Sequence, residues 1–273
     1  MSETTKLTPK QKWDQADLSN SFIFYKVMRD HPDACQHLLE ILLKIKIEQM
    51  EIHNEEVIEV DAEAKGIRLD IFVKDIGRMF DIELQVINTK ELPERARYYS
   101  SLMTLDSLKS GQKYSDLLDS HVIFICMENV FNNSLPVCTF ENICLEDGKT
   151  KLNDRDYRHF FIAPLCAKML KDKALKSFFD FLVSNHATDD YTNDLKKYVS
   201  DAKQNMNYKR QFMEWERQRT YDFDAGKEAG KYEKAIEAAK NLYTNGVSIE
   251  LIAKSLNMTI EQIKEIVFEA QKA

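Results

Sequence analysis

Residues 66–85 read GIRLDIFVKDIGRMFDIELQ, and this stretch predicts a β-hairpin. Two runs rich in β-branched and aromatic residues, 67–73 and 79–86, flank a short tip at residues 75–78. Apolar runs of this length on either side of a glycine-containing tip are typical of two antiparallel strands. The hairpin is the feature from which the rest of the fold is predicted.

Side chains in a strand alternate between the two faces of a sheet, so the hairpin places specific polar groups together. Glu83 and Gln85 share one face of the second strand. If Asp75 pairs with Arg78 at the tip, Asp70 of the first strand lies opposite Glu83. Directly opposed side chains have Cβ atoms about 4.5–5.5 Å apart.

Two carboxylates at that separation repel each other unless a cation lies between them. Mg²⁺ binds through one or two carboxylates together with water and substrate phosphates. Asp70 and Glu83 therefore predict a divalent metal site suited to phosphodiester chemistry. The alternative is that both acids lie on the solvent face of an exposed hairpin, with Arg68 and Arg78 as partners.

The same residues carry a family resemblance. An Asp, a hairpin and then Glu-x-Gln resemble the core of the PD-(D/E)XK nucleases, in the variant with Gln where most members have Lys. Residues 20–28, 92–99, 122–126 and 135–142 resemble the Rpn family of recombination-promoting nucleases, also described as PD-(D/E)XK nuclease family transposases. The family usually has an Asp at the position of Ser21.

The resemblance implies a restriction-endonuclease-like α/β fold, in which a mixed sheet is flanked by helices. It also implies a catalytic set of Asp70, Glu83 and Gln85. Asp70 and Glu83 would bind Mg²⁺ or Mn²⁺ together with the backbone carbonyl of Leu84. The amide of Gln85 can donate to water or to a phosphate oxygen and orient either one.

Substrate-phosphate contacts are expected from Arg95, Tyr99 and Arg68. Arg95 and Tyr99 lie four residues apart and share one face of a predicted helix at 94–110. Alternatives remain open: Tyr99 belongs to the core, Arg95 pairs with a surface acid, and Arg68 neutralises Asp70.

Composition restricts how the chain could bind nucleic acid. The 273 residues carry a formal net charge of −7, whereas proteins that bind nucleic acid over much of their surface are basic. Contact with DNA must then be local or assisted by metal ions. Five cysteines without a C-x-x-C pair predict reduced thiols, and no leader or long apolar run follows Met1, so we expect a soluble cytoplasmic protein.

The pattern of apolar residues predicts three regions: a disordered lead at 1–15, a nuclease-like domain at 16–185 and a helical extension at 186–273. Within the domain we expect helices at 20–30, 32–46, 94–110 and 174–184 and strands at 50–60, 121–127, 137–140 and 157–163. The extension is expected to contain one long helix over 194–219.

The last thirty residues resemble a helix-turn-helix, with helices at 249–255 and 260–270 capped by Ser248 and Thr259. The second helix is net acidic, which disfavours phosphate contact. We therefore favour a packing or self-association module, with a homodimer as the candidate assembly, over a DNA reader. The apolar residues of this module are expected to pack on the core or on a second copy; they include Ile252, Leu256, Ile263 and Ile266.

Two functional hypotheses follow. The first is a metal-dependent DNA endonuclease linked to recombination or mobile elements. The second is a non-catalytic protein of the same fold that binds DNA or a protein partner through its helical tail.

Overall fold

The computed structural model describes residues 7–53, 57–58, 67–68 and 71–269. It divides into two compact units, residues 1–209 and 210–273. Among the described residues, no helix is both long and apolar enough to cross a membrane.

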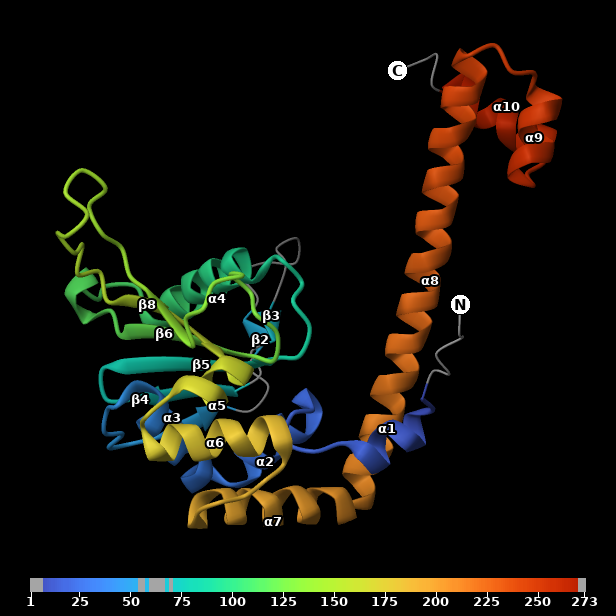
Figure 1. The fold of residues 1–273 in the computed structure, drawn as a ribbon. Helices are drawn as coiled ribbons and strands as arrows, with labels where there is room; N and C mark the ends of the chain where they lie inside the picture. Colours follow the sequence, from blue (N-terminus) through green and yellow to red (C-terminus); the bar gives the residue numbers. More distant parts are fainter. Residues whose placement is uncertain (1–6, 54–56, 59–66, 69–70, 270–273) are drawn as a thin grey trace. The chain divides into compact units, whose positions relative to one another are not determined.

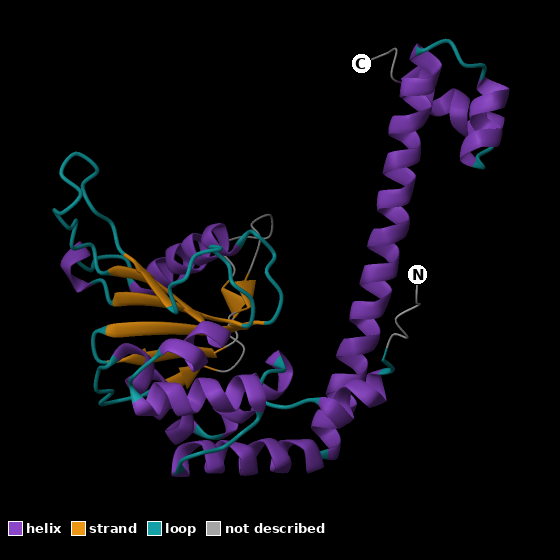
Figure 2. Cartoon of the chain, viewed as in Figure 1, coloured by secondary structure: helices purple, strands orange, loops and turns teal. Residues whose placement is uncertain are grey.

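The first unit is built around a mixed sheet of six strands in the order β1-β4-β5-β6-β8-β7 (Figures 1 and 2). β5 pairs in parallel with β6, and β6 with β8, while the other neighbours are antiparallel. The strands are β1 (Glu51–His53), β4 (Ile71–Asp75), β5 (Arg78–Gln85), β6 (Asp119–Cys126), β7 (Val137–Phe140) and β8 (Asp156–Ile162). This confirms the predicted mixed sheet flanked by helices.

The predicted hairpin forms between β4 and β5, with Asp75 paired with Arg78 and Ile71 paired with Ile82. The first predicted strand is described in two parts, residues 67–68 and 71–75. Its beginning, β3 (Ile67–Arg68), pairs with β2 (Val57–Ile58) in a separate two-stranded sheet. The backbone of β3 therefore bonds to β2, whereas that of β4 bonds to β5.

Helices cover both faces of the six-stranded sheet (Figure 1). α4 (Leu92–Ser107) packs on one face and contacts β6, and α2 (Ser21–Asp30) contacts β4 and β5 from the other. The remaining helices of this unit are α1 (Pro9–Gln15), α3 (Pro32–Leu43), α5 (Ala163–Met169), α6 (Lys173–Ser184) and α7 (Asp190–Gln204), with a short 3₁₀ turn, η1 (Tyr114–Asp116).

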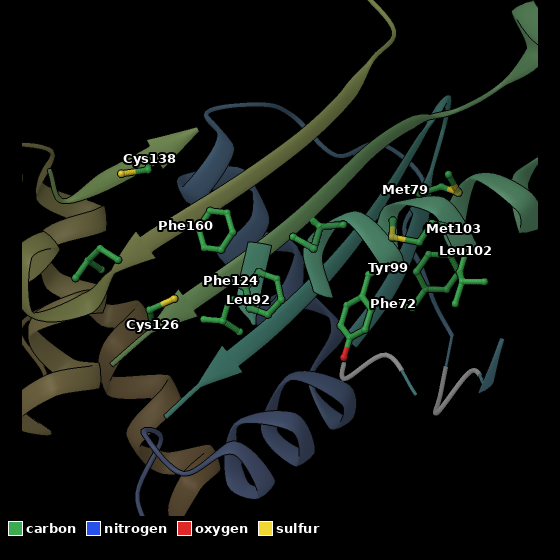
Figure 3. Close-up of a cluster of buried hydrophobic side chains, with 13 residues drawn as sticks. Phe72, Met79, Leu92, Tyr99, Leu102, Met103, Phe124, Cys126, Cys138 and Phe160 are labelled. Carbon is green, nitrogen blue, oxygen red and sulfur yellow. The ribbon is translucent and has the colours of Figure 1, made fainter. Parts of the chain in front are cut away.

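The core beneath α4 is aromatic and sulfur-rich (Figure 3). Phe124 stacks on Phe160 with ring centroids 5.4 Å apart, and Tyr99 stacks on Phe124. The buried members of this cluster are Phe72, Met79, Leu92, Ala96, Tyr99, Leu102, Met103, Val122, Phe124, Cys126, Cys138, Phe160 and Ile162. Because these residues come from five strands and one helix, the core fixes α4 against the sheet.

Two predictions of secondary structure were wrong. The expected disordered lead contains α1, because Thr8 and Gln11 cap each other's backbone and Trp13 is buried. The expected helix over 194–219 is two helices, α7 and α8 (Met206–Thr244). Asn205 separates them because its side chain accepts from the backbone N–H groups that begin α8.

The second unit contains most of α8, α9 (Ile249–Leu256) and α10 (Ile260–Glu269). Ser248 and Thr259 cap α9 and α10 as predicted, and Asn257 adopts the left-handed conformation between them. The apolar residues of the two short helices pack on the end of α8, around Ala239 and Ile236. The expectation that they need the core or a second copy was therefore wrong, because α8 supplies the missing surface.

Candidate active site

The second strand of the hairpin presents three polar side chains to α4. Asp81, Glu83 and Gln85 alternate with Ile82 and Leu84, which are buried on the opposite face. Asp81 is 0% exposed and Glu83 is 4% exposed. Two acids are thus buried on one face of the sheet, and the solvent-face alternative does not hold for Glu83.

Arg95 reaches this face from the first turns of α4. Its Nη2 donates to Glu83 Oε2 at 3.1 Å, and its Nη1 donates to Gln85 Oε1 at 2.8 Å. Pro93 in the first turn and the bond from Arg95 N to Glu91 O set the start of the helix. Arg95 therefore pairs with the predicted site residues and not with a surface acid.

Tyr99 lies one helical turn after Arg95 and contacts it directly. The Tyr99 hydroxyl accepts from Arg95 Nη2 at 3.0 Å and from Nε at 3.3 Å. Burial, followed by the nearby charge of Glu83, raises the pKa of Tyr99 to about 12, so the phenol is neutral at physiological pH. The Tyr99 ring belongs to the buried cluster, as the core alternative predicts, while its hydroxyl contacts Arg95 (Figure 3).

The loop after β5 is tied to the site through Gln85. The amide nitrogen of Gln85 donates to the backbone carbonyl of Ile87. The backbone N–H of Asn88 donates to Glu128 Oε2 at 2.8 Å, which links the loop to the segment after β6. The loop is therefore held by Gln85 at the end of β5 and by Glu128 just after β6.

Asp70 and the side chain of Arg68 lie outside the described residues. The described pairing of β4 with β5 begins at Ile71 and Ile82. The metal-ligand set of Asp70, Glu83 and Leu84 therefore stays a prediction. Arg78, named above as an alternative partner of these acids, pairs with Asp75.

Asp81 is a candidate that the sequence analysis did not select. It lies next to Phe72 on β4 and Val122 on β6, and its charge contributes to the raised pKa of Tyr99. The signal was present in the alternation of Asp81, Glu83 and Gln85. It went unused because an isolated strand pattern does not show which face is buried.

The donor chemistry of this face fits a hard divalent cation. Burying two carboxylates is costly unless positive charge compensates them, and Arg95 is paired with Glu83. Carboxylate and backbone carbonyl oxygens are the ligands that Mg²⁺ and Mn²⁺ prefer. In the part of the chain that the structure describes, no group of three or more His, Cys, Asp or Glu residues is arranged to hold a metal. A site here would need Asp70 or substrate oxygens.

Comparison with known families agrees with this geometry. A family model described as PD-(D/E)XK nuclease family transposase matches residues 23–162, just over half of the chain. The chain belongs to this family. The match spans the whole sheet from β1 to β8, together with Glu83, Gln85 and Arg95. Searches of curated proteins and of solved structures found no match. Family membership supports a nuclease-like function in mobile elements.

Proposed function

We propose that this chain is a divalent-metal-dependent DNA endonuclease that hydrolyses phosphodiester bonds during recombination or transposition of mobile elements. The observation that carries the proposal is the buried Glu83, held beside Gln85 and Arg95 on the sheet face of a PD-(D/E)XK family member. An acid buried next to a cation is costly to retain for stability alone, and it suits a ligand site.

The proposed ligands are the carboxylates of Asp70 and Glu83 and the backbone carbonyl of Leu84. When held by these residues, a Mg²⁺ or Mn²⁺ ion would supply Lewis-acid polarisation of the scissile phosphate and would lower the pKa of a water molecule. Asp81 adds a second buried acid whose charge favours a cation at this face.

Arg95, Tyr99 and Arg68 are the proposed phosphate contacts. The guanidinium of Arg95 places a positive charge beside Glu83 and Gln85, and guanidinium N–H groups are strong donors to phosphate oxygens. Tyr99 remains protonated because its pKa is about 12, so its hydroxyl can donate to a phosphate or sugar oxygen. Together these groups orient the DNA backbone while the buried acids stay on the sheet side.

Nicking of supercoiled plasmid tests the proposal. The wild-type chain should convert the plasmid in Mg²⁺ or Mn²⁺ and not in EDTA. Asp70→Ala and Glu83→Ala should each lower the rate at least ~10²-fold, as expected for loss of a strong transition-state stabiliser. Glu94→Gln, an exposed acid on the same helix as Arg95, is the matched control and should cut normally.

A separate measurement tests metal binding without catalysis. Titration calorimetry with Mn²⁺ should detect a site in the wild type that is lost in Asp70→Asn. Equal affinity in the two proteins would reject Asp70 as a ligand, whatever the nicking assay shows.

The second candidate function is DNA or protein binding by a non-catalytic member of the fold. The observation that favours it is the separate compact unit at 210–273, which ends in capped helices laid out like a helix-turn-helix. Its second helix exposes Glu261, Gln262, Lys264 and Glu265, so its charge favours a protein partner over DNA. Normal metal-dependent nicking by the full chain would remove the need for this alternative.

A further inference from the structure

The side-chain amide of Gln85 has both of its functional groups engaged within the protein. Its oxygen accepts from Arg95 Nη1 at 2.8 Å, and its nitrogen donates to the Ile87 carbonyl. A guanidinium only donates and a carbonyl only accepts, so the two partners fix the orientation of the amide. Gln85 thus bridges the helix and the loop that border the site.

Arg95 is held from several directions as a result. Glu83 accepts from Nη2 and Gln85 from Nη1, and the Tyr99 hydroxyl accepts from both Nη2 and Nε. Its guanidinium carbon also lies 5.3 Å from the ring centroid of Tyr99 and 5.5 Å from that of Phe124. These contacts hold the Arg95 side chain, which has many rotamers, in one position. A ligand that binds Arg95 then does not have to order it, and this saves binding free energy.

We propose that Gln85 is a positioning residue, which acts on the substrate through Arg95 and does not itself contact the scissile phosphate or its water. In this arrangement Arg95 is the cation that meets the DNA phosphate, and Gln85 holds it beside Glu83. That the anion bound by Arg95 is a DNA phosphate rests on the proposed function. That Gln85 positions Arg95 rests on the hydrogen bonds alone.

The proposal makes the substitutions at the two positions interdependent. If Gln85 acts through Arg95, removing the amide has a large effect when Arg95 is present and none when it is absent. If Gln85 contacts phosphate or water directly, the two losses are independent and multiply. Gln85→Met preserves length and volume without a hydrogen-bonding amide, and Arg95→Met does the same without the guanidinium.

The first experiment measures binding of a fluorescein-labelled DNA duplex to the full chain by anisotropy, with Ca²⁺ in place of Mg²⁺ to slow cleavage. We expect about a tenfold loss of affinity for Gln85→Met, a loss of ten- to a hundredfold for Arg95→Met, and no further loss in the double variant. Arg97→Met is the matched control, because Arg97 is exposed on the same helix, and it should bind nearly as tightly as wild type. Multiplied losses in the double variant, or unchanged affinity for Gln85→Met, would overturn the proposal.

The second experiment does not depend on DNA. The side-chain Nε–H of Arg95 is identified in ¹⁵N-labelled protein by its disappearance in Arg95→Met. In wild type it should exchange slowly with solvent, because it donates to Tyr99, and exchange should become at least about tenfold faster in Gln85→Met. Equal exchange rates would reject the hold on Arg95. A different outcome would separate the two ideas. If the wild type does not bind DNA but exchange is still faster in Gln85→Met, then Gln85 positions Arg95 and only the proposed substrate is refuted.

Discussion

Removal of the Asp75 carboxylate should destabilise the first unit more than loss of any half-exposed ion pair near it. The Asp75 side chain is 0% exposed and lies at the tip of the β4–β5 hairpin. It accepts from the backbone N–H groups of Gln49 at 2.8 Å and Glu48 at 3.1 Å, and from Arg78. Asp75→Ala leaves these donors without their acceptor inside the protein.

The magnitude follows from the type of contact. Leaving partly buried donors without their charged acceptor costs about 1–3 kcal/mol, since Arg78 is 23% exposed and can still reach water. For a unit of this size, each kcal/mol lowers Tm by about 2–4 °C, so the expected shift is roughly 2–12 °C. Asp106→Ala is the control: its pair with Lys74 is 2.7 Å long and about 30% exposed, so its loss should cost less than about 1 kcal/mol.

The pH dependence gives a second check on the same residue. Burial acts to raise the pKa of Asp75, but hydrogen bonds from Gln49, Ile76, Glu48 and Arg78 outweigh it and lower the pKa below 3.8. Because the folded pKa is depressed, the stabilisation is fully present above the unfolded pKa near 3.8. It is lost as the pH falls through the lower folded pKa.

Urea unfolding at pH 6 should therefore give a lower free energy of unfolding for Asp75→Ala than for wild type or Asp106→Ala. The difference between Asp75→Ala and wild type should shrink when the pH falls below 4. A cost at pH 6 no larger than that of Asp106→Ala would refute the assignment of Asp75 as the main polar anchor of the hairpin tip.

Three further predictions concern other parts of the chain. Burial, followed by the charge of His159, lowers the pKa of His121 to about 3, so the free energy of unfolding should fall as the pH drops from 6.5 towards 3. In urea titrations, His121→Phe should lose about 1–2 kcal/mol less stability than wild type between pH 7 and pH 5, and an equal loss in both proteins would contradict this. Tyr99→Phe should weaken binding of duplex DNA a few-fold and leave the pH dependence of that binding below pH 10 unaltered, since the pKa of Tyr99 is about 12. A change in the pH dependence near neutral pH would show that the phenol ionises there. Light scattering should give a dimer mass for the full chain and a monomer mass for a chain ending at Arg219, if exposed apolar residues such as Leu251 and Phe268 mediate association; two monomers would exclude a homodimer through the C-terminal helices.

The sequence predicted the hairpin and its register because both depend on period-two alternation and a short tip, which are local properties. It also placed Arg95 and Tyr99 on one face of a helix, because a spacing of four residues is sufficient for that. It could not predict that Arg95 bridges Glu83 and Gln85, since that contact depends on how α4 packs on the sheet. The buried state of Asp81 depends on the same packing.

The errors in the helical regions have a similar origin. Residues 194–219 are rich in helix formers, so the pattern predicted one unbroken helix there, although Asn205 is a favourable cap. The apolar residues of α9 and α10 lacked a visible partner because the contacting face of α8 is separated from them by a loop. In each case the deciding contact lies between elements and is absent from local propensity.

The distribution of cysteines gives this protein an internal reporter of local opening. All five thiols are free and lie in the first unit; Cys35, Cys126, Cys138 and Cys166 are buried, and Cys144 is partly exposed. Burial raises the pKa of Cys35, Cys126 and Cys166 to about 12, so neither access nor ionisation favours alkylation while the fold is closed. Cys126 pairs with Gln85 across the parallel strands, so its alkylation rate would time the separation of the strand that carries the site from its neighbour.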